Sequence, residues 1–162
     1  MPITPFHFGP GFLFSEITAR YISFPLFIII QIVIDFESAY NLIMGNYPIH
    51  QAAHTFLGNT VLTIVISFIF YFAEERIMVV RFLSGFTHRK IIVTTLTASF
   101  SHTFFDSIMH HDAHPFSPFS EKNPFLEMIS ISVLHDFCLY SALFGLTIFI
   151  FRKLRSRKKS NV

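Results

Sequence analysis

Long apolar segments alternate with short polar ones along most of the chain. The apolar segments cover residues 24–44, 55–73, 91–110 and 129–151, and each approaches the roughly 20 residues that an α-helix needs to cross a bilayer. This pattern predicts an all-α integral membrane protein, a bundle of four transmembrane helices. A further helix is expected over residues 11–23, which are too few and too polar for a full span, so we expect it to be short or re-entrant.

Composition agrees with a chain that lies almost entirely in the membrane. Of its 162 residues, 52% are hydrophobic and only 14% are charged, whereas soluble domains carry about 25% charged residues. We expect one membrane-embedded domain over residues 1–151 and a basic tail over residues 152–162. No cleaved signal peptide is expected, because the first basic residue is Arg20. The single Cys138 excludes an internal disulfide and a cysteine-based zinc site.

The basic residues predict the orientation of the chain. If the four spans alternate in direction, all of the 12 Lys and Arg residues except Lys122 fall on one side. The positive-inside rule assigns that side, and with it the C-terminus, to the cytoplasm. We expect the bacterial inner membrane as the location. The tail is expected to contact anionic lipids rather than nucleic acid.

Histidine and acidic residues gather at the opposite ends of the predicted spans. The candidate metal ligands are His7, Asp35, His50, His54, His102, Asp106 and His110. Two pairs, His50 with His54 and His102 with Asp106, have the spacing of four residues that places both side chains on one helical face. Imidazole and carboxylate ligands without thiolates suit a divalent metal, zinc first, with manganese or iron as alternatives.

The acidic residues within the spans also suggest catalytic roles. An aspartate inside a membrane is costly and indicates function by default. Because Asp35 and Glu37 are two residues apart, they cannot lie on the same face of a regular helix, so at most one is expected to bind the metal. We assign catalytic roles to Glu37, as a general base, and to Asp106.

The order of these motifs resembles a family of predicted membrane-bound, metal-dependent hydrolases of bacterial inner membranes. The matching positions are His7, Ile34-Asp35-Phe36-Glu37, His50-x-x-x-His54-Thr55 and Ser101-His102-x-x-x-Asp106, within residues 1–120. Two positions depart from the family pattern, since Ile34 replaces a proline and Glu37 replaces a second aspartate. The resemblance implies a metal-dependent hydrolase and specifies no substrate.

Three functions remain open at this stage. The first is hydrolysis of an ester, amide or phosphoester in a lipid-like substrate, by metal-activated water at the outer leaflet. The second is transport of a metal ion or a proton, although the inner halves of the second and fourth spans offer few polar residues for a path. The third is electron transfer by a b-type haem held between paired histidines. The loop over residues 112–127 is expected to be a lid over the site or an interfacial anchor.

Overall fold

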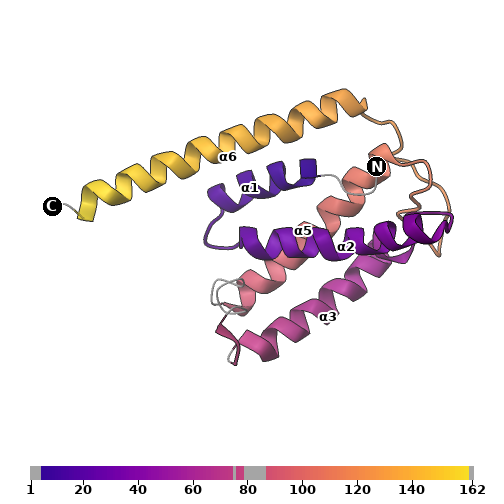
Figure 1. Cartoon of the computed structure of the whole chain (residues 1–162), viewed down its shortest axis with the longest axis horizontal. Coiled ribbons are helices and arrows are strands. Elements are labelled where there is room, and N and C mark those ends of the chain that lie inside the picture. The colour runs from indigo at the N-terminus through magenta and orange to yellow at the C-terminus, as the bar shows by residue number, and fades with distance from the viewer. Residues whose placement is uncertain (1–4, 75, 79–86, 161–162) are drawn as a thin grey trace.

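The structure is a computed structural model that describes residues 5–74, 76–78 and 87–160, and over these residues it is all-helical, as predicted. Its elements, shown in Figure 1, are η1 (Pro5–His7), α1 (Phe8–Ile17), α2 (Phe24–Met44), η2 (Ala52–His54), α3 (Phe56–Glu74), α5 (His88–Met109) and α6 (Ile131–Ser160). Helix α5 packs against both α2 and α3, and α1 lies between α2 and the long α6. Arg81, one of the basic residues used to predict the orientation, lies outside the described residues.

Three helices, α2, α3 and α6, are long and apolar enough to cross a membrane, which fits an integral membrane protein. The predicted count of four spans is not confirmed, because α5 has the length, 22 residues, but not the apolar composition. Its polar side chains, among them Thr94, Ser99 and His102, are buried within the bundle instead of facing outward. These polar residues lower the hydropathy of α5. The helix can carry them because its neighbours cover its polar face.

A row of hydrogen bonds joins α3 to α5. The Thr63 hydroxyl donates to Ser99 Oγ over 2.9 Å, and the hydroxyls of Ser67 and Thr95 lie 2.9 Å apart. One turn closer to the start of α3, the Asn59 side chain donates to the Ser99 carbonyl over 3.2 Å. Small hydroxyl residues of this kind join helices where no water can satisfy them. They fix the position of α5 along α3.

The N-terminal helix begins and ends earlier than predicted. It covers Phe8–Ile17 instead of residues 11–23, because the turn at Pro5–His7 leads directly into it and a tight turn at Thr18 ends it. Ten residues make a helix about 15 Å long, too short to cross a bilayer. Since α1 leads back into α2, His7 lies at the same end of the bundle as the last turn of α5.

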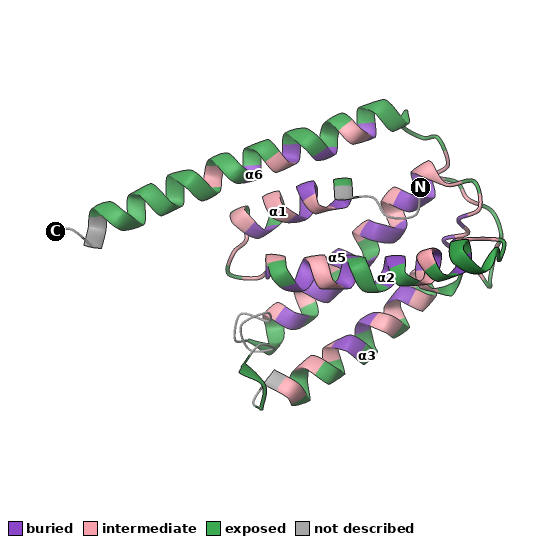
Figure 2. Cartoon of the chain, in the orientation of Figure 1, coloured by how far each residue is buried: buried purple, intermediate pink, exposed green. Residues whose placement is uncertain are grey.

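Helix α6 lies along α1 at one edge of the bundle. A side chain on Gly9 would place its Cβ 2.1 Å from the carbonyl oxygen of Cys138, so the two helices approach this closely only because Gly9 has no side chain. Figure 2 shows that most of the remaining surface of α6 is exposed. The helix does not end at residue 151 but continues to Ser160, since Lys and Arg are good helix formers. Arg152 pairs with Glu16 of α1 over 2.9 Å.

Candidate metal centre

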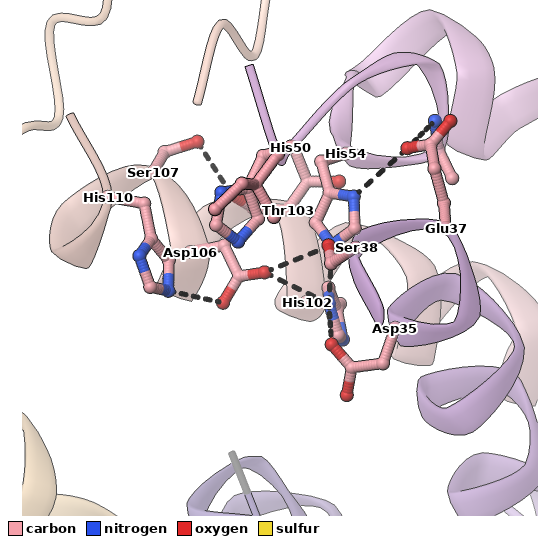
Figure 3. Close-up of polar contacts among 12 residues, drawn as sticks. Asp35, Glu37, Ser38, His50, His54, His102, Thr103, Asp106, Ser107 and His110 are labelled. Carbon is pink, nitrogen blue, oxygen red and sulfur yellow. Dashed lines mark hydrogen bonds and ion pairs between the residues drawn. The ribbon is translucent and has the colours of Figure 1, made fainter. Parts of the chain in front are cut away.

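The carboxylate of Asp106, in the last turn of α5, lies at the centre of a group of imidazoles (Figure 3). Its Oδ2 atom is 3.0 Å from Nε2 of His102 and 3.3 Å from Nε2 of His54. Its Oδ1 atom is 3.6 Å from Nε2 of His7 and 4.0 Å from Nε2 of His110. Asp106 is 3% exposed, so these rings replace water as its surroundings.

Four buried residues from three elements offer one ligand atom each within 4.8 Å of one another, namely Asp35, His54, His102 and Asp106. Nε2 of His102 lies 3.4 Å from Oδ1 of Asp35 and 3.4 Å from Nε2 of His54. Metal bonds of about 2.0–2.1 Å at tetrahedral angles place ligand atoms about 3.3–3.4 Å apart. The three distances among His54, His102 and Asp106, and the one from His102 to Asp35, are 3.0–3.4 Å and so suit ligands of one tetrahedral ion.

Three of the imidazoles are held through Nδ1, the ring nitrogen opposite Nε2. In each ring Nδ1 faces a side-chain oxygen: His54 faces Glu37 at 3.3 Å, His50 faces Asp112 at 2.9 Å, and His102 faces Gln31. An oxygen acceptor at Nδ1 keeps the proton on that nitrogen and leaves the lone pair on Nε2. Carboxylates and carbonyls occupy this position behind metal-binding histidines in many proteins. The Nε2 atoms are thus prepared as ligands.

Asp35 and Glu37 have different partners, as their spacing on α2 predicts. Asp35 faces His102 inside the four-residue group, whereas Glu37 contacts the side of His54 that faces away from Asp106 (Figure 3). The Glu37 carboxylate also accepts from the backbone N–H of Ala53 over 2.9 Å. This geometry gives Glu37 a part in holding His54, and its predicted role as a general base stays a prediction.

Two residues of the site, Gln31 and Asp112, were not predicted as part of it. Gln31 precedes Asp35 by one helical turn, so the spacing of four on α2 could have indicated it. Asp112 accepts from the backbone N–H groups of Ile49 and His50 as well as from the His50 ring. No periodic signal marks it, because it lies in a loop.

A second group adjoins the first and shares Asp106 with it. His50 and His110 each offer a ligand atom that lies, with one of Asp106, within 4.8 Å of the others. The rings of His50 and His110 are stacked with their centroids 4.1 Å apart. Both ring nitrogens of His7 and Nε2 of His50 are buried and have no hydrogen-bond partner. Buried polar atoms without partners are rare and call for an explanation such as a bound ion.

Burial changes the pKa values of two histidines near the site, His7 and His110. Burial lowers the pKa of His7 to about 4, and burial also lowers the pKa of His110 to about 4, so both rings are neutral at pH 7. Burial alone would raise the pKa of Asp112, but the hydrogen bond and charge of His50, together with the backbone hydrogen bonds from His50 and Ile49, hold that pKa below its usual value. The imidazoles of His7 and His110 therefore have the form that binds metal ions.

The loop over residues 112–127 folds over the end of α5. The Asn123 side chain donates to the Ser107 carbonyl over 2.8 Å, and Phe125 packs against Phe56 and Phe116. Phe119 is 84% exposed, and the two predicted roles of the loop, lid or interfacial anchor, stay predictions. His111 and His114 lie outside the two ligand groups: His111 pairs with Glu127 at the surface, and His114 contacts the carbonyl of Glu121.

Comparison with protein-family models, with curated proteins and with solved structures gave no match. The resemblance to membrane-bound hydrolases therefore stays a prediction from the motifs alone. What the structure adds is independent of that resemblance, since it brings together His7, Asp35, His54, His102 and Asp106 at one end of the bundle.

Proposed function

We propose that the protein is a metal-dependent hydrolase of the bacterial inner membrane, with its site near the outer leaflet. The observation that carries the proposal is the convergence of Asp35, His54, His102 and Asp106, whose ligand atoms lie within 4.8 Å of one another, with oxygen acceptors behind both imidazoles. Zinc suits such nitrogen and oxygen ligands, and manganese and iron are alternatives. The basic residues, concentrated on α6 beyond Phe151, support placing the opposite end of the bundle outside the cytoplasm.

The chemistry is the addition of water to an ester, amide or phosphoester. The metal ion would supply a water of lowered pKa and polarise the oxygen of the scissile group. The water oxygen forms a bond to the carbonyl carbon or phosphorus, and the bond to the leaving group breaks. One water proton passes to a carboxylate, for which Glu37 is the predicted base, and ends on the leaving oxygen or nitrogen. Glu37 and Gln31 keep the rings of His54 and His102 in place through their Nδ1 atoms during these steps.

A lipid-like substrate is supported by a groove beside the site. The groove, of about 610 Å³, is lined along α3 by Leu57, Val61 and Val65 and reaches Glu37. Glu37 in turn contacts His54. An acyl chain in the apolar part of this groove would have its polar end near the imidazoles. Many ligand sites likewise have a mostly apolar wall, in which a few polar groups orient the ligand.

Two observations argue against the other functions. Carboxylate oxygens of Asp35 and Asp106 lie 3.4 and 3.0 Å from Nε2 of His102, in the space that a porphyrin ring needs around an axial imidazole nitrogen. Thr63 and Ser67, the hydroxyl residues of α3 that a transport path would use, bond to side chains of α5. They thus serve helix packing.

The test is metal-dependent hydrolysis by the purified full chain in detergent. The protein is stripped with a chelator, reloaded with Zn²⁺, Mn²⁺ or Fe²⁺, and assayed on p-nitrophenyl esters, p-nitrophenyl phosphodiesters and fluorescent phospholipids. We expect activity to return only with metal and to fall more than about 100-fold in His102→Ala. The matched control His111→Ala, at an exposed ring, should keep wild-type activity. Activity that is unchanged by chelation, or hydrolysis of none of these substrate classes, would contradict the proposal.

Replacement of Glu37 separates its two roles. If Glu37 holds His54 through Nδ1, Glu37→Ala weakens metal affinity about 10- to 100-fold, and Glu37→Gln restores most of it because the amide oxygen still accepts from Nδ1. If Glu37 is also the base, both variants lose about 10²- to 10⁴-fold in kcat at saturating metal. Competition with a fluorescent chelator measures the affinity. Wild-type affinity in Glu37→Ala would refute the role in holding His54.

A further inference from the structure

The two oxygens of Asp106 have different surroundings. Oδ2 faces Nε2 of His54 and Nε2 of His102, at 3.3 and 3.0 Å. Oδ1 faces Nε2 of His7 and Nε2 of His110, at 3.6 and 4.0 Å. Figure 3 shows Asp106 between His110 on one side and His54 with His102 on the other. A carboxylate in this position can bind one cation through each oxygen.

We propose that the cluster holds two divalent ions, with Asp106 as the ligand that bridges them. The first ion occupies the group of Asp35, His54 and His102 on the Oδ2 side. The second occupies the Oδ1 side and is bound by His50 and His110, with His7 as a further donor. This inference rests on the metal-binding part of the proposed function and adds a second ion to it.

The unpaired nitrogens on the Oδ1 side support a second ion. His7 is 2% exposed and His50 is 4% exposed, yet Nε2 of each has no hydrogen-bond partner. The His50 ring is fixed by Asp112 at Nδ1, so its Nε2 is the nitrogen left to bind. A single ion on the Oδ2 side would leave these buried nitrogens without a partner, which is unfavourable for a buried polar atom. An ion on the Oδ1 side provides them with a partner.

The charges of the cluster also favour two ions. The cluster contains four carboxylates, which belong to Asp35, Glu37, Asp106 and Asp112. Two divalent ions carry as much positive charge as four carboxylates carry negative charge, and one divalent ion carries half of it. Uncompensated charge is costly at a buried site within a membrane protein, where the surroundings screen it poorly.

A pair of ions about 3.5–4 Å apart would supply a clamp on both the attacking and the leaving oxygen of a displacement. This is the arrangement of many phosphoesterases and aminopeptidases. Among the substrate classes proposed above, the second ion therefore favours a phosphoester or an amide. The chain's own contribution is the fixed spacing: Asp106 comes from the rigid last turn of α5, and the His50 ring is held by Asp112.

The test uses Mn²⁺, which reports both number and proximity. The full chain in detergent is stripped, loaded with Mn²⁺ and freed of excess, and its metal content is measured by inductively coupled plasma mass spectrometry. We expect two Mn²⁺ per chain and an electron paramagnetic resonance spectrum of an exchange-coupled pair. His110→Ala, at a partly exposed ring, should bind one Mn²⁺ and show the hyperfine-split spectrum of an isolated ion. The adjacent control His111→Ala should bind two.

The outcomes separate this inference from the proposed function. One Mn²⁺ per wild-type chain with the spectrum of an isolated ion overturns the second site and leaves a one-metal hydrolase intact. Two ions without magnetic coupling overturn the bridging role of Asp106. No bound metal at all overturns both proposals. Because the decisive measurement is made on the wild-type chain, a failure of a variant to fold does not leave the inference untested.

Discussion

Asp106→Asn is expected to abolish metal binding at both groups while leaving the fold intact. Asparagine has the shape of aspartate, but its neutral oxygen is a weak ligand and its amide N–H₂ would face the lone pairs of His54 and His102. Each ligand group contains Asp106, so one substitution affects both. Metal content should fall to background, and hydrolysis with it.

Thermal unfolding gives a second measurement of the same change. A ligand present at 100 times its Kd stabilises the folded state by about 2.7 kcal/mol. Chelation should therefore lower the Tm of the wild-type protein and leave the Tm of Asp106→Asn unchanged. The matched control is Asp136→Asn, which removes the same charge from an exposed position of α6. Wild-type metal content in Asp106→Asn would remove the basis of both proposals.

Gly58→Ala is expected to destabilise the protein and to weaken metal binding, although alanine favours helices over glycine by about 1 kcal/mol. A Cβ on Gly58 would lie 1.8 Å from the backbone oxygen of Ala52 and 2.7 Å from its carbonyl carbon. Backbone atoms cannot move aside as a flexible side chain can. The added methyl group must push η2 away from α3, and η2 ends at His54.

The expected size of this effect follows from overpacking, which costs about 1–3 kcal/mol. A thermal unfolding scan should show a lower Tm for Gly58→Ala, and metal titration should show weaker binding through the displaced His54. Thr60→Ala is the control, because it lies two residues along the same helix and its hydroxyl bonds only to the carbonyl of Phe56 in the preceding turn. A Tm at or above the wild-type value in Gly58→Ala would show that η2 adjusts without cost.

The apolar pattern was sufficient to predict the main helices. The predicted bounds of α2 coincide with the observed ones, because Pro25 marks its first turn and Gly45 follows its end in a left-handed conformation. For α5 the pattern predicted a helix, but a membrane span is not confirmed there, because buried polar side chains lower the hydropathy of this helix. The apolar pattern also underestimated the length of α6. The basic residues after residue 151 end the apolar segment, but they continue the helix.

The candidate ligands were predicted from residue type and spacing, and the structure brings all of them to one end of the bundle. The position of His7 beside the site depends on the turn near Thr18. The spacing of residues in the sequence could not predict this turn. The residues that hold the rings were harder to find, because Gln31 and Asp112 act on the far side of each imidazole. Such partners are defined by contacts between distant segments.

The fixed positions of the imidazoles also affect which cations the site would bind. Because oxygen acceptors hold the rings of His54 and His102 before any ion enters, the ligand spacing of 3.0–3.4 Å cannot expand freely. Calcium requires six to eight oxygens at about 2.3–2.6 Å, and magnesium prefers an octahedron of oxygens. We therefore expect the alkaline-earth ions, however abundant, to compete poorly for a site in which two of the four ligands, His54 and His102, are imidazoles.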